Sequence, residues 1–157
     1  MTNVEKRLDI LLRHIENVRN NCIILAKKLE ERGEADFALK LIANGQIHDN
    51  SKFHGIEWEY LHGDVKESNP ELFLNAAKQH IFNNPHHPEY WQNIQEMPRI
   101  YLAEHCADIL ARSQEFGQCL WDWIENEGMK KYGYTKKDKV GKQVKEFVSL
   151  LLETSFK

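Results

Sequence analysis

The sequence predicts an all-α fold: a single helical domain over residues 1–157, a bundle of roughly seven helices. Apolar residues return every three or four positions over long stretches, as they do along one face of a helix. Glycines, prolines and capping residues separate these stretches, where helices would end and begin. No stretch shows the strict apolar–polar alternation of a half-buried strand. A chain of 157 residues is also long enough to bury a core without disulfides.

The longest helix is expected over residues 3–32. Its apolar stripe advances in steps of four and three, through Val4, Leu8, Leu11, Ile15, Val18, Cys22, Leu25 and Leu29. Charged residues fill the other faces, and Gly33 is a suitable stop. A coiled-coil strand would show the same stripe, but no later segment continues the heptad, so we interpret it as a packed helix. His14 lies beside the stripe, where its ring can face inward.

Six further helices are expected over residues 34–47, 51–62, 70–81, 97–116, 119–129 and 136–156. Ser51 is a suitable N-cap for the third helix, and Gly63 a suitable stop. Pro70 suits the first position of the fourth helix. Residues 64–69 are polar and are expected to form a loop.

The composition is that of a soluble globular protein, with 41% apolar and 29% charged residues. The net charge of −3 offers no excess of Lys and Arg for phosphate backbones, so nucleic-acid binding is not expected. Cys22, Cys106 and Cys119 form no CxxC pair, which favours reduced thiols. No apolar signal segment and no run near the ~18 residues of a membrane span is present. We expect a cytoplasmic protein without a membrane partner.

Residues 46–53 carry the adjacent pair His48 and Asp49, which offers two metal ligands at one backbone point. Lys52 adds a mobile positive charge three residues later. Such a pair is weak by itself, but six of the eight histidines lie between positions 48 and 87: His48, His54, His62, His80, His86 and His87. Neutral imidazole and carboxylate groups bind Mn²⁺, Fe²⁺, Co²⁺, Ni²⁺ and Zn²⁺.

Two further features favour a metal site. His86 and His87 stand between two prolines, which stiffen a loop whose ligands must hold position. Asp108 lies in the apolar face of the helix over 97–116, where a buried carboxylate needs a partner. Seven residues are therefore expected to converge on one or two divalent transition-metal ions: His14, His48, Asp49, His80, His86, His87 and Asp108.

Several candidate ligands also have ordinary structural interpretations. Asp49 could cap the next helix, and Lys52 could be a solvated surface lysine. His14 could be a satisfied histidine at the edge of the core. Asp108 could pair with Arg112 or with a core histidine instead of a metal.

The remaining histidines and aromatic residues receive simpler assignments. His54 and His62 are taken as surface residues. His105 points about 60° away from Asp108 around the helix and is left out of the ligand set. Tyr90 and Trp91 are packing residues or, alternatively, a stacking wall for a base. Trp58 is also assigned to packing.

The order of these motifs resembles the HD-domain superfamily of metal-dependent phosphohydrolases. That family has a histidine on an early helix, a His-Asp pair at a helix end and an aspartate on a later helix. Its HD-x-x-K form is matched by residues 48–52, and its Ala-Asp-x-Leu-Ala form by residues 107–111. The likeness covers roughly residues 8–113. Residues 80–91 are also similar to a group of small, uncharacterised bacterial and phage HD-like proteins.

The resemblance implies a ligand set. The first metal would be held by His14, His48, Asp49 and Asp108. Asp49 would bridge to a second metal held by His80 and by His86 or His87. Two-metal members place their extra histidines much further apart than the six residues between His80 and His86. Whether all three of these histidines bind, and whether a second metal is present, therefore stays open.

The resemblance also implies catalytic roles. A metal-bound water at the Asp49 centre would attack phosphorus. Lys52 and Arg112 would neutralise phosphoryl oxygens, and Glu57 or Glu104 would donate the leaving-group proton.

We therefore expect a metal-dependent phosphohydrolase acting on a small phosphate ester, with a nucleoside monophosphate as a candidate by family analogy alone. One alternative keeps the same ligands in a di-iron HD-type oxygenase. Another is a non-catalytic helical module that binds metal or a partner. The long first helix offers a face for a homodimer.

Overall fold

The computed structural model describes residues 2–155 and confirms the all-α prediction. These residues form α-helices joined by short turns and contain no strand. Taking three contiguous segments over residues 120–132 as one helix, the described chain has eight helices, one more than expected. The extra helix is α4 (Gly63–Ser68), which occupies the segment expected to be a loop. None of the helices described is both long enough and apolar enough to cross a bilayer.

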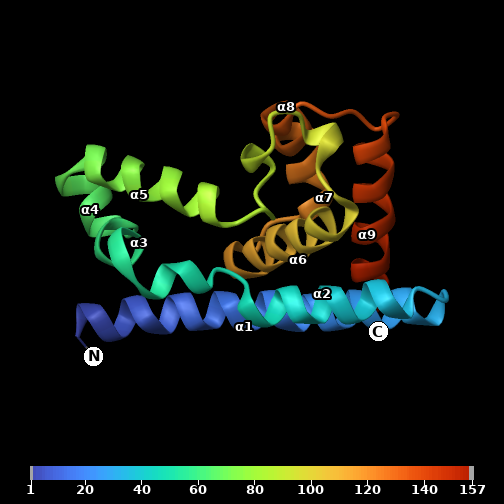
Figure 1. The fold of residues 1–157 in the computed structure, drawn as a ribbon, viewed down its shortest axis with the longest axis horizontal. Coiled ribbons are helices and arrows are strands. Elements are labelled where there is room, and N and C mark those ends of the chain that lie inside the picture. The colour runs from blue at the N-terminus through green and yellow to red at the C-terminus, as the bar shows by residue number, and fades with distance from the viewer. Residues whose placement is uncertain (1, 156–157) are drawn as a thin grey trace.

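The base of the fold is an antiparallel hairpin of α1 (Asn3–Glu31) and α2 (Ala35–Ile47) (Figure 1). Thr2 and Glu5 form a capping box that starts α1. Gly33 turns the chain after α1 with a φ of 88°, a conformation that suits glycine. Both helices therefore follow the predicted bounds closely.

The core lies where α6 (Arg99–Phe116) and α9 (Lys139–Ser155) pack against this hairpin (Figure 1). Its largest fully buried side chains include Leu25, Leu29, Leu41, Leu102 and Phe147. The expected apolar stripe of α1 is buried only from Ile15 onward. Val4 is 58% exposed, because no helix of the core covers the N-terminal end of α1.

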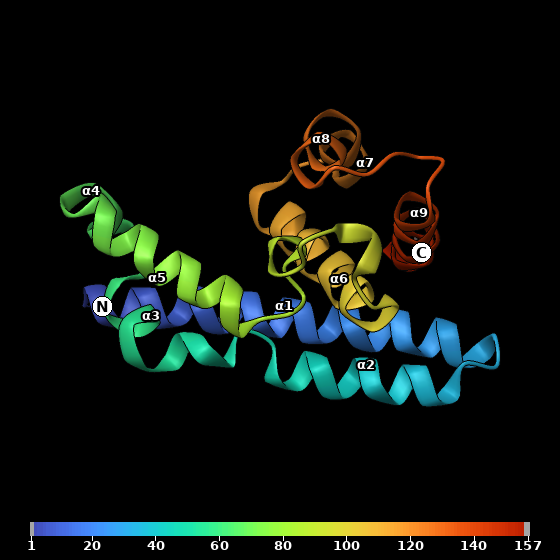
Figure 2. The ribbon, with the colours of Figure 1, turned by 45° about the horizontal axis from the view of Figure 1, so that its top comes forward.

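A second group of helices extends away from the core, over the N-terminal half of α1 (Figure 2). It comprises α3 (Gly55–Tyr60), α4 and α5 (Pro70–Asn83), and the latter two pack against each other. The helix expected over 51–62 is interrupted at His54, whose extended backbone separates the 3₁₀ turn η1 (Asn50–Phe53) from α3. Ser51 is not a cap, because its hydroxyl donates to Glu57 instead. Asn69 caps α5, with Pro70 at its first position.

The C-terminal part closes the core from the far side. Two 3₁₀ turns, η2 (Pro88–Tyr90) and η3 (Ile94–Glu96), lead into α6. After α6, three contiguous segments, α7 (Leu120–Trp123), the π-turn η4 (Ile124–Gly128) and α8 (Met129–Tyr132), form the helix expected over 119–129. Helix α9 starts at residue 139 instead of 136, because Asp138 accepts hydrogen bonds from the backbone of Thr135 and Gly141. Its expected end at Phe156 lies outside the described residues.

Candidate metal centre

Side chains from five parts of the chain meet between the core and the α3–α5 group. The seven predicted ligands, His14, His48, Asp49, His80, His86, His87 and Asp108, all belong to this cluster. They come from α1, the end of α2, α5, the loop after α5, and α6. Most are almost completely buried, although they are polar. Such burial is unfavourable unless the groups are paired or coordinate an ion.

Asp49 is the centre of the cluster. Its backbone adopts the left-handed conformation, with a φ of 55°, which aspartate tolerates better than most residues. Its side chain caps no helix, which removes the first alternative interpretation. One carboxylate oxygen, Oδ2, lies 3.6 Å from His48 Nε2 and 3.9 Å from His14 Nε2. The other, Oδ1, lies 3.3 Å from His80 Nε2 and 3.4 Å from His86 Nε2. The carboxylate therefore spans two groups of histidines.

The first group consists of His14, His48 and Asp108. His14 Nε2 lies 3.2 Å from Asp108 Oδ1. Asp49 Oδ2 completes this side, so the four residues that the resemblance assigned to the first metal do come together. Asp108 lies beside His14, as in the alternative interpretation in which it pairs with a core histidine. It also faces the centre that the other ligands share.

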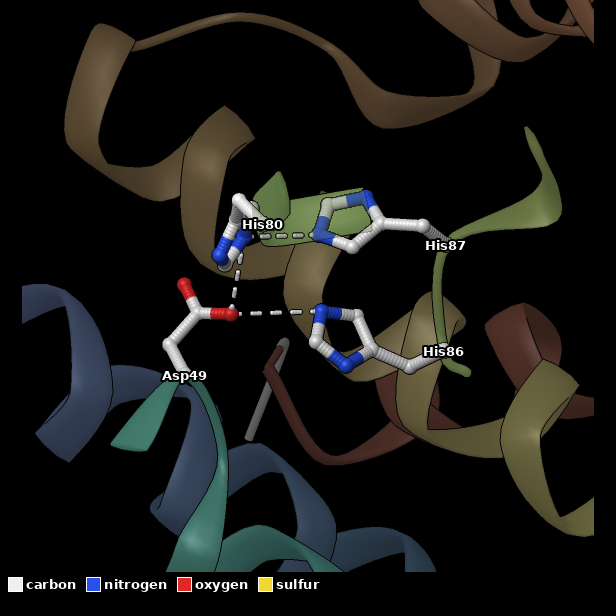
Figure 3. A group of neighbouring side chains, drawn as sticks. All are labelled: Asp49, His80, His86 and His87. Carbon is white, nitrogen blue, oxygen red and sulfur yellow. Dashed lines mark hydrogen bonds and ion pairs between the residues drawn. The ribbon is translucent and has the colours of Figure 1, made fainter. Parts of the chain in front are cut away.

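The second group consists of Asp49, His80, His86 and His87 (Figure 3). The three histidine rings converge because the chain leaves α5 and turns back at Asn84 and Pro85. The six residues between His80 and His86 are therefore enough to bring both rings to one place. Asn84 stabilises this turn by donating to the carbonyl oxygen of His80 at 2.7 Å. All three candidate histidines therefore reach the second group.

Each of four histidines directs Nδ1 to a carboxylate and Nε2 to the centre. The pairs are His14–Glu115 at 2.8 Å, His48–Glu104 at 2.9 Å, His80–Glu57 at 2.8 Å and His86–Glu104 at 3.2 Å. Carboxylates placed behind metal-binding histidines orient the ring and raise its basicity. This arrangement prepares four Nε2 atoms for coordination.

Four inward-facing atoms have no hydrogen-bond partner among the described residues: His14 Nε2, His48 Nε2, Asp49 Oδ1 and His86 Nε2. The contacts of His80 and His86 with Asp49, and of His14 with Asp108, are short but lack hydrogen-bond geometry. An unpaired buried polar atom is destabilising by about 1–3 kcal/mol. Imidazole and carboxylate donors of this kind fit divalent transition metals. The residues present therefore fit one or two such ions, with Asp49 shared.

A third group, His48, His86 and Glu104, also has the spacing of a ligand set. Glu104 Oε1, however, already lies within hydrogen-bonding distance of Nδ1 on both histidines. We therefore assign Glu104 to orientation of the rings.

The electrostatics keep the central carboxylates ionised. Burial acts to raise the pKa of Asp49, but the charges of His48 and Lys52 and the contacts with the other histidines hold it well below its usual value. The pKa of Asp108 is lowered in the same way, against the effect of burial, by His14, His48 and His86. Both side chains are therefore anionic near neutral pH, as metal ligands must be.

His86 and His87 differ in charge. Burial acts to lower the pKa of His86, but contacts with Asp49 and Glu104 raise it to about 10. Burial, reinforced by the charges of His86 and His80, lowers the pKa of His87 to about 2. His87 is therefore neutral, whereas a metal must displace a proton from His86.

Two adjoining cavities, of about 430 and 740 Å³, open onto the centre. Both are lined by Lys52, Leu61, His80, His87 and Arg112. Lys52 Nζ lies 2.6 Å from Asp49 Oδ2, so Lys52 is half-buried and paired, which argues against a freely solvated lysine. Arg112 is exposed, with Nη1 3.4 Å from Glu115 Oε2. The two predicted phosphate-binding cations thus lie beside the centre.

The remaining predicted site residues have roles other than those expected. Glu57 and Glu104 stand behind histidine rings, which favours positioning over proton donation. Tyr90 and Trp91 line neither cavity. Trp91 Nε1 donates to the carbonyl oxygen of Pro85 at 2.9 Å and thereby braces the histidine loop. The packing interpretation of Trp91 therefore fits the structure better than the alternative of a stacking wall for a base at Tyr90 and Trp91.

His54 is exposed, as predicted, whereas His62 is half-buried and lines the larger cavity. His105 stays outside the ligand groups, with its ring edge-on to Tyr132. Sequence reasoning missed Glu115, which orients His14. Its spacing to Asp108 offered a signal, because residues seven apart share a helix face.

Residues 3–154 match the model of a family described as "Family of unknown function (DUF5662)". The chain belongs to this family. No curated protein and no solved structure matches the chain. The family match runs from the first residue of α1 nearly to the end of α9, so every element that contributes to the candidate centre lies inside it.

Proposed function

We propose that this chain is a metal-dependent phosphohydrolase, of the HD type that its motifs resemble, acting on a small phosphate ester. The main support is the set of four buried, inward-facing atoms without partners: His14 Nε2, His48 Nε2, Asp49 Oδ1 and His86 Nε2. Three of these atoms belong to rings whose other nitrogen faces a carboxylate. This pattern is typical of metal ligands and not of satisfied core histidines.

We propose two ion positions that share Asp49. The first would be held by His14, His48, Asp49 and Asp108, and the second by Asp49, His80, His86 and His87. Asp49 supports this assignment because its two oxygens face different histidine groups. When bound, a divalent ion supplies a water of lowered pKa and polarises a phosphoryl oxygen.

The chain's own cations would bind the substrate phosphate. Lys52 already reaches the centre, and Arg112 stands at the rim of both cavities. Charge-assisted hydrogen bonds from such groups neutralise phosphoryl oxygens. Lys52 could exchange its present partner, Asp49, for a phosphoryl oxygen. Glu57 and Glu104 would hold His80, His48 and His86 in orientation.

The test begins with protein purified without chelator. Its bound metals are measured, and a phosphate-ester panel is assayed with Mn²⁺, Co²⁺ and Ni²⁺. Asp49→Ala and His48→Ala should lose metal and activity together while helical content stays near wild type. His54→Ala, at an exposed histidine outside the cluster, is the matched control. Full metal occupancy in both cluster variants would contradict the proposal.

A second candidate uses the same ligands. Five histidines and two aspartates form a nitrogen-dominated donor set, and imidazole suits iron. A di-iron oxygenase would contain iron, consume oxygen and leave the phosphate esters intact. A metal-binding module without catalysis would retain metal and show neither activity.

A further inference from the structure

The larger cavity extends from the candidate centre toward the N-terminus of α1. On α1 it is lined from His14 back to Asn3, with Val4 and Arg7 between them. At a rise of about 1.5 Å per residue, the ten residues from Val4 to His14 cover about 15 Å. The cavity volume, about 740 Å³, lies within the range of small-molecule sites. The cavity is therefore long enough for a group attached to a phosphate at the metal centre.

The walls of this cavity are largely apolar. They include Val4, Ile10, Leu11, Trp58, Leu61 and Phe73. Val4 and Ile10 are 58% and 64% exposed, so the apolar surface at this end of α1 is open. An open apolar surface that continues into a polar centre is typical of a ligand site.

A flat, cationic surface stands within the same cavity. The guanidinium carbon of Arg7 lies 3.9 Å from the ring centroid of Trp58, and its Nη2 donates to the Trp58 carbonyl oxygen. These contacts hold the guanidinium over the indole ring. Arg7 forms no ion pair among the described residues, and the nearest charge that acts on it is that of Asp64, which lines the same cavity. Aromatic rings stack on guanidinium planes and on indole rings.

We propose that this cavity binds the leaving group of the substrate, and that this group is a flat aromatic ring stacked on the Arg7–Trp58 pair. The proposal rests on the phosphohydrolase function proposed above. Arg7 and His14 are seven residues apart, about 10 Å along α1, which separates the ring site from the phosphate site. The apolar side chains of the wall, such as Leu11, Leu61 and Phe73, match a ring better than a polar sugar, although Lys6, His62 and Asp64 also line the cavity.

The closing experiment compares two phosphonates, phenylphosphonate and methylphosphonate, which share the head group and cannot be hydrolysed as esters. Each is titrated calorimetrically into the metal-loaded protein under nitrogen. Phenylphosphonate should bind at least tenfold more tightly. Trp58→Ala should reduce this ratio to below about threefold and leave the Kd of methylphosphonate unchanged. If Trp58→Ala fails to fold, Phe73→Ala, which removes another aromatic residue of the cavity lining, should lower the ratio independently.

Tyr90→Ala is the matched control, because Tyr90 is an exposed aromatic residue that lines neither cavity. It should leave both Kd values unchanged. Equal binding of the two phosphonates, or a ratio unaffected by folded Trp58 and Phe73 variants, would overturn the ring site but not the hydrolase. Binding of neither phosphonate, together with no ester turnover, would instead overturn the hydrolase on which the ring site rests.

Discussion

The Nε2 atoms of His80 and His87 lie only 2.9 Å apart. His80 already directs Nδ1 to Glu57, so its Nε2 carries a lone pair when the ring is neutral. Two lone pairs at this distance repel each other unless a proton or a cation lies between them. A metal bound by both His80 and His87 would therefore stabilise the position of the His87 ring.

We expect His87→Ala to weaken the second metal position selectively. Metal content of the purified variant should fall from two ions to one per chain, or the weaker of two chelator-competition affinities should fall roughly 10- to 100-fold. The first position should be unchanged, because His14 and His48 do not contact His87. An unchanged stoichiometry and affinity would show that His87 is not a ligand.

The carboxylates that contact the histidine Nδ1 atoms should differ in how strongly their loss weakens metal binding. Glu104 contacts Nδ1 of both His48 and His86, whereas Glu115 contacts only His14. Loss of such a partner typically weakens metal binding 10- to 100-fold. Glu104→Gln should therefore weaken both metal positions, and Glu115→Gln only the first. Competition with a chelator measures both effects, and equal effects of the two variants on both positions would contradict the assignment.

His105 predicts an acid sensitivity that does not involve metal. Burial lowers the pKa of His105 to about 4, from an ordinary value of 6.5. The unfolded chain therefore takes up a proton at this residue below pH 6.5, whereas the folded chain resists it until about pH 4. Stability from this residue is present above pH 6.5 and is lost as the pH falls toward 4, by roughly 3 kcal/mol.

His105→Leu should flatten this dependence. Urea unfolding of the metal-free protein at pH 7 and pH 4.5 measures the difference between the variant and wild type. His87 also has a lowered pKa and contributes in both proteins, so only the difference reports on His105. Identical pH profiles would show that burial does not hold His105 neutral.

We expect a single methyl group added at Gly141 to lower the stability of the fold substantially. A Cβ at this position would overlap the carbonyl oxygen of Thr135, which is backbone and cannot move aside cheaply. Gly141→Ala should lower stability by about 2 kcal/mol or more, and Tm by roughly 5 °C or more. Gly63→Ala is the control, because nothing lies within 4 Å of its Cβ position, and its stability should change by less than about 1 kcal/mol.

Much of the fold was predictable, because helix periodicity and caps are local. The stripe of α1, the proline at the first position of α5 and the stop at Gly33 all act within a few residues. Two expectations were wrong because contacts beyond the immediate neighbours in the chain decide the structure of those segments. The helix expected over 51–62 breaks at His54, where the hydroxyl of Ser51 bonds to Glu57 instead of capping. The polar segment 64–69 is helical, and α4 packs against α5.

The sequence by itself determined that the chain is helical, that His48 and Asp49 stand at a helix end, and that a second set of histidines follows in a stiff loop. These features depend on neighbours in the chain. Only the tertiary structure decided that Asp49 faces two histidine groups, that Glu104 serves two rings, and that Arg7 and Trp58 form a flat surface beside them. Those relationships join side chains from distant helices, and their geometry depends on how whole helices pack.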